Sequence, residues 1–437
     1  MNIILSSTRK YPGSLLIVLT IGLLFRFAFI SLHERPLFSD EKEFDQLAYN
    51  LATKASYSYD TSPTAYRPVG YPAFVGFIYF VFGHHQTVVK LLQAVIDTVS
   101  SFLIYLLLVG HPERIRVFGA ILWAFFAPAI FYANLLLSET IFTFLFVLIA
   151  WMLTRNDAGS TWRIVVLGLL LGVLTLIKPT FIIFVLVLFF LLPQLKLPLR
   201  RIYPLAIAFV LVLAPWLVRN YLVFGEIALS SNGGINLMIG NNVTTTGAYK
   251  YAFDPVIFHG AKGEFDVDHR ALLLASDYIV HHPITFFVNA AKKTGRLLES
   301  EGALLILTFY EYPDNPSPRY AAKYASLSLF WILATNFSYF IVVLAAIFGF
   351  LSSERNKLWW IALAAFISWV IVHAMFFGGG RFHFPLMPLI AVFAAQFLVE
   401  PRKRYQSLSR IQKGIAYSFL TVFCTLWLIE AYVIFHG

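Results

Sequence analysis

Residues 14–32 read SLLIVLTIGLLFRFAFISL, and Arg26 is the one charged residue among them. About 20 apolar residues are enough to cross a bilayer as a helix. The stretch follows the basic residues Arg9 and Lys10 and lacks a small-residue cleavage site, which is typical of a retained span and not of a cleaved signal peptide. We therefore predict that this segment is the first transmembrane helix of the chain.

The composition of the whole chain extends this conclusion. Of its 437 residues, 59% are hydrophobic and 13% are charged, whereas soluble domains are about half apolar and about a quarter charged. The predicted fold class is an all-α polytopic membrane protein. We interpret the net charge of +10 as anchoring charge on cytoplasmic loops, and expect no nucleic-acid partner. The single cysteine, Cys424, excludes an internal disulfide and a cysteine-based metal cluster.

Apolar segments recur along the chain. We predict about 11 transmembrane helices, with about 13 as the upper limit. They lie near residues 14–32, 88–109, 117–136, 139–154, 163–177, 180–193, 202–218, 329–351, 358–377, 382–399 and 414–435. The apolar segment 71–82 is too short to cross, and is predicted to be interfacial or re-entrant.

The distribution of basic residues supports this topology. With the N-terminus inside, the short inside loops are 110–116, 155–162, 194–201, 352–357 and 400–413, and each of them carries Arg or Lys. Cytoplasmic loops are enriched in these residues. If residues 71–82 also crossed, all of these loops would face outside. We therefore predict that the C-terminus lies outside.

Two long polar segments then face outside and divide the chain. Residues 1–218 are predicted to form an N-terminal transmembrane region that carries a first outer loop, 33–71. Residues 219–328 form a large outer loop, and residues 329–437 form a C-terminal transmembrane region. Within the large loop, helices are predicted over 268–280 and 283–298, after a stretch rich in turn-forming residues. The two halves show no inverted repeat, which weakens a secondary-transporter interpretation.

The first outer loop carries four acidic residues within six positions: Asp40, Glu41, Glu43 and Asp45. Asp40 follows the first span closely, so its carboxylate is expected near the membrane interface. There it could deprotonate an acceptor hydroxyl while a sugar–phosphate bond breaks. Part of the cluster could instead hold a divalent cation against a phosphate. The third alternative is a solvated helix start, where acidic residues are favoured.

Three basic residues at predicted outer ends of spans are candidates for binding a phosphate. Arg67 lies in YRPVGYP and offers a planar fork to phosphate oxygens, or it snorkels to lipid head groups. Lys178, in IKPT, is a second phosphate ligand or an interfacial anchor. Arg381, in GGGRFHFPLMP, is the third candidate, and the glycines before it permit close backbone approach. His383 in the same motif is interpreted as a satisfied interfacial histidine.

Two further acidic residues lie at membrane depth, where a carboxylate is costly unless it is paired or ligating. Glu139, in NLLLSET, is a candidate metal ligand, or it belongs to a helix cap with Ser138. Asp97 lies inside a predicted span and is expected to make a packing hydrogen bond with the nearby hydroxyls of Thr98, Ser100 and Ser101. No phosphate-cradling glycine-rich loop is found. No cofactor is therefore required, and a divalent cation remains an option.

The order of these motifs resembles the glycosyltransferase C superfamily, specifically its bacterial family 39-like members, relatives of protein O-mannosyltransferases and of the lipid A aminoarabinose transferase. The motifs that carry the resemblance are Asp40-Glu41, YRPVGYP, SET, GGINLMIGNN with a following Thr-Gly, and RFHFPLMP. The resemblance implies transfer of a monosaccharide from a polyprenyl-phosphate carrier. It assigns the catalytic carboxylate to Asp40 and phosphate contacts to Arg67 and Arg381.

These expectations together describe an inverting transferase with Asp40 as general base. Arg67, Arg381 and Lys178 would bind the donor phosphate, with Glu41 and Glu139 as supporting acids. The partners would be a polyprenyl-phosphate sugar, membrane lipids and a glycan, lipid or protein acceptor. The expected location is the bacterial inner membrane, with the active site on its outer face. The alternatives are a polymerase or ligase that uses a polyprenyl-diphosphate-linked glycan, and a lipid or solute transporter.

Overall fold

The computed structural model describes residues 11–155, 160–249, 255–310 and 320–436, so the predicted anchoring residues Arg9 and Lys10 lie outside the described part. Helices dominate this part. Its strands are β1 (Ser58–Tyr59) and β2 (Ser62–Pro63), which pair as one small antiparallel hairpin.

Seven helical segments in the described part are long and apolar enough to span a membrane, or nine if two bent pairs are each counted as one span. The seven are α1 (Gly13–Leu32), α4 (Gln86–Leu107), η2 with α11 (Leu199–Arg201, Ile202–Phe224), α17 (Leu329–Leu351), α18 (Lys357–Met375), η4 with α19 (Gly380–Leu386, Met387–Val399) and α21 (Arg410–His436). The protein is therefore an all-α integral membrane protein. The count of eleven spans stays a prediction.

Shorter apolar helices occupy the other predicted spans. They are α7 (Glu139–Thr154), α8 (Thr161–Ile177), η1 (Pro179–Phe181), α9 (Ile182–Phe190) and α10 (Leu192–Leu195). The predicted span 117–136 is not a straight helix, because α5 (Glu113–Ala124) and α6 (Ala127–Ala133) meet at a bend of 50°; counted together they are one of the two bent pairs. Pro128, in the first turn of α6, has no N–H to continue a helix, and Phe126 before it is extended.

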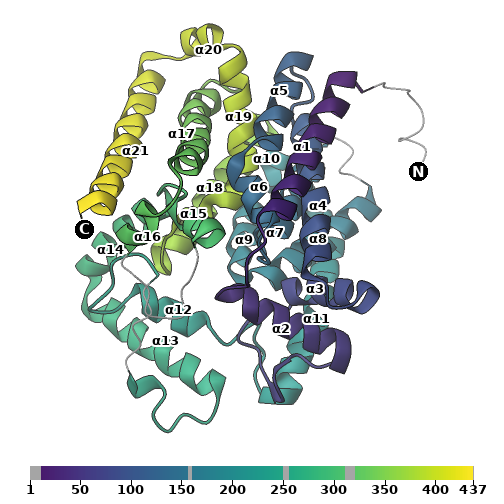
Figure 1. Cartoon of the computed structure of the whole chain (residues 1–437), viewed down its shortest axis with the longest axis vertical. Coiled ribbons are helices and arrows are strands. Elements are labelled where there is room, and N and C mark those ends of the chain that lie inside the picture. The colour runs from purple at the N-terminus through teal and green to yellow at the C-terminus, as the bar shows by residue number, and fades with distance from the viewer. Residues whose placement is uncertain (1–10, 156–159, 250–254, 311–319, 437) are drawn as a thin grey trace.

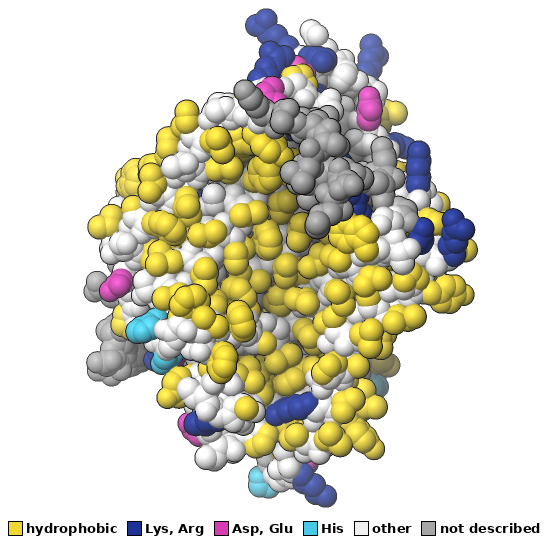
Figure 2. Space-filling view, turned by 90° about the vertical axis from the view of Figure 1, so that its right-hand side faces the viewer, with side chains coloured by type: hydrophobic (Ala, Val, Ile, Leu, Met, Phe, Trp, Pro, Cys, Tyr) yellow, Lys and Arg dark blue, Asp and Glu magenta, His cyan; other side chains and the backbone are white. Residues whose placement is uncertain are grey.

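The remaining helices gather mainly at one end of the bundle, which we call the loop end (lower part of Figure 1). They are α2 (Asp40–Lys54), α3 (Gly70–Phe82), α12 (Gly233–Gly240), η3 (Pro255–Ile257), α13 (Glu264–His281), α14 (Pro283–Leu297), α15 (Gly302–Phe309) and α16 (Tyr320–Ala325), whereas α20 (Pro401–Ser407) lies at the opposite end. The helices predicted over 268–280 and 283–298 are thus confirmed. Figure 2 shows a broad apolar face with most of its Lys and Arg side chains toward the end opposite the loop end.

A buried ion pair joins three helices within the bundle. Arg26 on α1 donates from Nε and Nη2 to Asp97 Oδ2 on α4, at 2.8 and 2.5 Å, and Trp123 Nε1 on α5 donates to Oδ1 at 3.0 Å. The prediction that nearby hydroxyls satisfy Asp97 is wrong, because the Thr98 hydroxyl donates to Ala94 O of its own helix. The desolvation cost of this buried ion pair is offset because both partners are hydrogen-bonded on several sides.

The two polar loops contact each other directly at the loop end. The carboxylate of Glu264, at the start of α13, accepts hydrogen bonds from Thr64 Oγ1 at 2.7 Å and Ala65 N at 2.5 Å. Ser231 N donates to Ala65 O at 3.0 Å. These contacts fix the chain immediately before Arg67, so the large loop determines where a residue of the first loop is held.

Candidate active site

A cavity of about 1280 Å³ lies at the loop end, where the first loop meets the ends of several apolar helices. Asp40 and Arg67 line it from the first loop, Lys178 from the turn between α8 and η1, and Arg381 from η4. The sequence placed these four residues far apart along the chain. The fold brings them to one cavity.

Asp40 lies between two arginines. Its Oδ1 accepts a hydrogen bond from Arg67 Nη2 at 2.8 Å, and its Oδ2 accepts one from Arg381 Nη1 at 2.9 Å. All three side chains are only about one-fifth to one-quarter exposed, at 19%, 21% and 25%. Each carboxylate oxygen therefore has its own guanidinium partner in a partly desolvated place.

The contacts continue on both sides of Asp40. Arg67 Nε donates to Glu43 Oε2 at 2.5 Å. Beyond Arg381, Glu139 Oε1 lies 3.3 Å from Arg381 Nε and 3.2 Å from Lys178 Nζ. The result is an alternating chain of three acidic and three basic side chains, which we call the charged network. It contains the predicted catalytic carboxylate, the three predicted phosphate ligands and one of the two predicted supporting acids.

The network sets the electrostatics of Asp40. Burial raises the pKa of its carboxyl, but the neighbouring Arg381 and Arg67 outweigh that effect and lower the pKa from 3.8 to about 2. For Arg67, burial lowers the pKa, but Asp40 and Glu43 more than compensate and raise it above its ordinary value. Asp40 is therefore ionised at neutral pH, yet it is a weak base while both arginines hold it, since a general base works best with a pKa near the working pH.

Arg67 is held by aromatic rings and by its own backbone. The centre of its guanidinium lies 5.6 Å from the ring centroid of Phe44 and 5.4 Å from that of Tyr66, within the range of cation–π attraction. The Tyr57 hydroxyl donates to Arg67 O at 2.8 Å. Together with the hydrogen bonds from Thr64 and Ala65 to Glu264, which we call the Glu264 clamp, these contacts orient the planar guanidinium of Arg67 toward Asp40.

Arg381 is positioned by the glycines that precede it. A Cβ atom on Gly378 would lie 2.0 Å from Lys293 O, and one on Gly380 would lie 2.5 Å from Ser300 O. The predicted close approach is thus made to α14 and to the turn that follows it. Any larger residue at either position would push Arg381 away from Asp40.

His383, two residues after Arg381, is buried. Its Nε2 lies 3.0 Å from Glu301 Oε1, and its Nδ1 lies 2.9 Å from Leu297 O. Both ring nitrogens are occupied by protein partners, as expected of a satisfied histidine. It acts on the site only by fixing η4 against the end of α14.

Glu41 points away from the charged network, although it is the next residue after Asp40. Its side chain is 3% exposed. Oε1 accepts from Leu136 N at 2.8 Å, and Oε2 accepts from Arg35 Nη2 at 2.6 Å and from Phe38 N at 3.2 Å. Its contacts tie α2 to the turn between α6 and α7. Glu41 therefore supports Asp40 by holding α2 in place and not by contact with the charged network.

Glu139 does not fit the role of a metal ligand. Its Oε1 contacts two positive groups, those of Lys178 and Arg381, which would repel a divalent cation at that position. Among the residues that the structure describes, no group of three or more His, Cys, Asp or Glu side chains is arranged to hold a metal. Its contacts instead make Glu139 the counter-ion of two of the basic residues.

Sequence reasoning missed the role of Glu43 and most of the wall of the cavity. The only signal for Glu43 was its spacing of three residues from Asp40, which places both on one side of α2. Asp45, two residues further, instead accepts from the Tyr79 hydroxyl at 2.6 Å and contacts His84 at 3.0 Å. The wall residues come from many helices that are far apart in the sequence, among them α9, α15, α18 and α21, and have no common motif.

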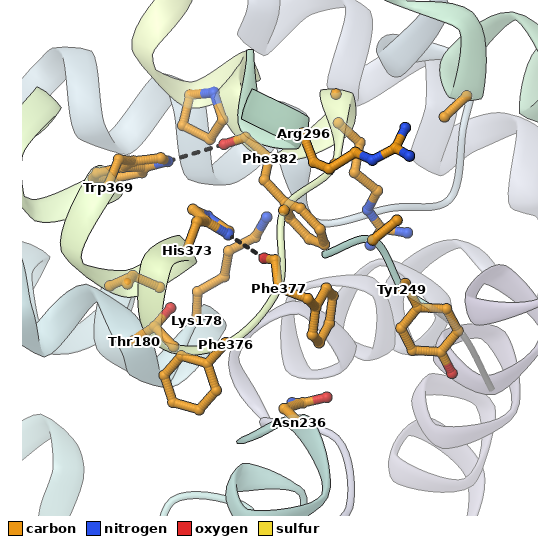
Figure 3. A pocket seen from close by; sticks show the side chains of 18 of the residues that line it. Lys178, Thr180, Asn236, Tyr249, Arg296, Trp369, His373, Phe376, Phe377 and Phe382 are labelled. Atoms are coloured by element: carbon orange, nitrogen blue, oxygen red, sulfur yellow. Dashed lines mark hydrogen bonds between the residues drawn. The ribbon is translucent and has the colours of Figure 1, made fainter. Parts of the chain in front are cut away.

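Two parts of the cavity wall are largely apolar, and we call them arms. The α9–α18 arm, which begins in η1, is lined by Phe181, Ile182, Ile183, Phe184, Ser368, Trp369, Val372 and His373. The α15–α21 arm is lined by Ala303, Ile306, Leu307, Leu426, Ile429 and one carboxylate residue, Glu430. Figure 3 shows Trp369 and His373 on one side of the cavity and Arg296 and Tyr249 on the other, with Lys178 and Phe382 between them. The cavity therefore combines a charged centre with two hydrophobic extensions.

The fold is similar to that of solved membrane enzymes. The oligosaccharyltransferase of Archaeoglobus fulgidus, in its apo form, matches with a TM-score of 0.50 and 14% sequence identity over 98% of this chain and 56% of that chain. The chain therefore shares the fold of this oligosaccharyltransferase over nearly its whole length. ArnT from Cupriavidus metallidurans, bound to undecaprenyl phosphate, matches with a TM-score of 0.45 and 13% identity over 89% of this chain and 78% of that chain. No protein-family model and no curated protein sequence matches.

This likeness of fold is consistent with the resemblance drawn from the order of the sequence motifs. The chain spans about half the length of the archaeal oligosaccharyltransferase, whose match covers 56% of that protein. At this sequence identity the likeness shows the fold alone. The function must therefore be argued from the residues of the cavity.

Proposed function

We propose that this protein is a glycosyltransferase that moves a monosaccharide from a polyprenyl-phosphate carrier to a hydroxyl group of an acceptor. The site would face the outer side of a bacterial inner membrane. The observation that carries the proposal is the carboxylate of Asp40 between Arg67 and Arg381, 2.8 and 2.9 Å away, in a cavity with apolar arms. A lipid phosphate can pair with two such arginines, and its isoprenoid tail can lie against such an apolar wall.

The donor phosphate would exchange partners with Asp40. Guanidinium groups form bidentate, charge-assisted hydrogen bonds with phosphate oxygens. When the phosphate takes Arg67 and Arg381, Asp40 loses the two positive neighbours that lower its pKa. Its basicity rises at the moment when the donor is in place. Lys178 supplies further positive charge, and the tail lies in the α9–α18 arm beside it.

The chemical step then follows from this arrangement. Asp40 accepts the proton of the acceptor hydroxyl, whose oxygen forms a bond to the anomeric carbon. The bond between that carbon and the phosphate oxygen breaks on the opposite face, and its electron pair leaves with the phosphate. The configuration at the anomeric carbon is inverted. Arg67 and Arg381 stabilise the negative charge that develops on the leaving phosphate.

The same network supports a second candidate, an enzyme that uses a polyprenyl-diphosphate-linked glycan. Arg67, Arg381 and Lys178 together provide three positive charges, which also suit a diphosphate. The two candidates differ in the carrier that they bind. Titration with undecaprenyl phosphate and with undecaprenyl diphosphate separates them, since the first proposal requires tighter binding or faster turnover of the monophosphate-linked donor.

The test of the proposed function is turnover in nanodiscs with a panel of undecaprenyl-phosphate-linked monosaccharides, measured as release of undecaprenyl phosphate by mass spectrometry. Asp40→Asn should abolish release, because an amide keeps the shape but cannot accept the proton. Asp60→Asn is the matched control, since Asp60 is exposed, lies outside the network and has a positive φ of 48° that Asn tolerates. Normal turnover of Asp40→Asn would refute the role of Asp40 as general base.

A further inference from the structure

We propose that the α15–α21 arm binds the acceptor, and that this acceptor is a second membrane lipid with an anionic, hydroxyl-bearing head group. The inference rests on the proposed glycosyl transfer and names the class of acceptor. It follows from the wall of the arm, from the way α21 is attached, and from the basic residues of α14 that line the same cavity.

The wall of the arm is largely apolar. α15 contributes Ala303, Ile306 and Leu307, and α21 contributes Leu426, Ile429 and one polar residue, Glu430, whose carboxylate is hydrogen-bonded to Ser300. A glycan or a polar peptide would gain little from these side chains, whereas an acyl chain gains from every methylene that it buries. Only 11% of the membrane-length window of α21 is buried within the protein. The arm is therefore bordered by a helix that lies largely against lipid, which gives a lipid a lateral route of entry.

α21 is attached at its loop end by specific polar contacts. Trp427 Nε1 donates to Leu298 O at 3.0 Å. The carboxylate of Glu430 accepts from Ser300 N at 2.8 Å and from Ser300 Oγ at 2.7 Å. These contacts connect α21 to the turn between α14 and α15. They hold the helix so that one of its faces completes the arm, which is therefore a built part of the cavity.

Two basic residues of α14 line the same cavity as the arm and the charged network. Lys292 and Arg296 lie one turn apart on α14 and both line the cavity. Lys292 is exposed, and Arg296 pairs with Glu299. Burial raises the pKa of Glu299 to about 7, although Arg296 acts to lower it. Basic side chains at a membrane surface attract anionic head groups. Two acidic residues line the same part of the cavity: Glu299 carries less than a full negative charge near neutral pH, and the carboxylate of Glu430 is held by Ser300 N and Oγ.

The two arms are bordered by different helices. In Figure 1, α9 and α21 are well separated, with α15 and α18 between them. The donor tail in the α9–α18 arm therefore leaves the α15–α21 arm free. Two lipids can approach the charged network from separate sides, with the donor's anomeric carbon and the acceptor's hydroxyl meeting at Asp40.

The experiment is photolabelling with phosphatidylglycerol that carries a diazirine in one acyl chain, a probe with both a phosphate and free hydroxyls. The protein is the Asp40→Asn chain in nanodiscs without sugar donor, so that no turnover is needed. Label should fall on α15 and on the cavity-lining residues Leu426 and Ile429 of α21, and it is read residue by residue because bulk lipid also reaches the outer face of α21. Leu426→Trp, which fills the arm, should reduce labelling by about fivefold or more. The matched control is Leu428→Trp, since Leu428 is 71% exposed on the same helix and its replacement should leave labelling unchanged.

Two further comparisons complete the test. Diacylglycerol with the same photoreactive chain should label α15 and α21 more weakly than phosphatidylglycerol does. In the double variant Lys292→Gln, Arg296→Gln, the two probes should label equally. The proposal is overturned if Leu426→Trp labels like the parent chain, or if diacylglycerol labels equally well. It is also overturned if excess undecaprenyl phosphate displaces the label and Leu426→Trp weakens binding of that carrier, because the arm would then hold the donor tail. Failure of the proposed transfer itself appears only in the turnover assay.

Discussion

Removing the negative charge of Asp40 is expected to tighten carrier binding while it abolishes transfer. In the ligand-free protein the phosphate must displace Asp40 from both Arg67 and Arg381. The pKa of Asp40 is lowered from 3.8 to about 2, and each pKa unit corresponds to about 1.4 kcal/mol. The arginines therefore stabilise the carboxylate by about 2 kcal/mol beyond the cost of its burial, at a side chain that is 19% exposed.

A phosphate that takes both arginines must offset this stabilisation in the wild-type protein, but not in Asp40→Asn. We expect undecaprenyl phosphate to bind Asp40→Asn about tenfold more tightly, since about 1.4 kcal/mol is a factor of ten in affinity and the exchange need not be complete. The assay is a binding titration in nanodiscs at neutral pH, with Asp60→Asn as control. Equal or weaker binding by Asp40→Asn would show that the arginines do not leave Asp40 for the phosphate.

Three other predictions follow from the site and its supports. Arg67→Lys keeps the charge but loses the planar fork. Loss of one charge-assisted hydrogen bond, about 1.5–3 kcal/mol, should weaken carrier binding about tenfold to hundredfold, and Arg67→Ala should bind more weakly still. Wild-type affinity of Arg67→Ala would show that Arg67 is only an interfacial anchor. Glu264→Gln should loosen the clamp before Arg67 and weaken binding of undecaprenyl phosphate severalfold without loss of expression, and unchanged affinity would contradict a positioning role. After removal of Cys424, cysteines at the exposed positions Ser62 and Val243 should both react with an impermeant reagent in intact cells, whereas protection of both would reverse the predicted topology.

The sequence was sufficient for features that depend on local pattern. The helices at 268–280 and 283–298 were predicted from apolar spacing and appear as α13 and α14. The candidate charged residues were found because each lies at the end of an apolar segment, where a charge stands out. The predicted close approach near Arg381 rested on its glycines, whose lack of a Cβ is required at Gly378 and Gly380.

Features that depend on distant pairs were not predictable. Asp97 was expected to find nearby hydroxyls, but its partner is Arg26, 71 residues away. Adjacent acids at the start of one helix diverge, because successive residues on a helix point in different directions. Asp40 therefore enters the cavity and Glu41 contacts the turn before α7. The arms likewise could not be predicted, because their walls come from helices whose packing no single segment encodes.

The alternating charges of the network explain how a site for an anionic lipid can exist in an apolar cavity before the lipid arrives. Arg67, Arg381 and Lys178 without counter-ions would repel one another and carry a large desolvation cost. Glu43, Asp40 and Glu139 balance their charge in the ligand-free protein, but only Asp40 lies between two arginines. A phosphate can take its place at both, whereas Glu43 and Glu139 continue to hold Arg67 and Lys178 from the far sides. The residue displaced by the donor is thus the one that would act as the base, so its activation depends on the donor being bound, and a cavity without carrier contains only a weakly basic carboxylate.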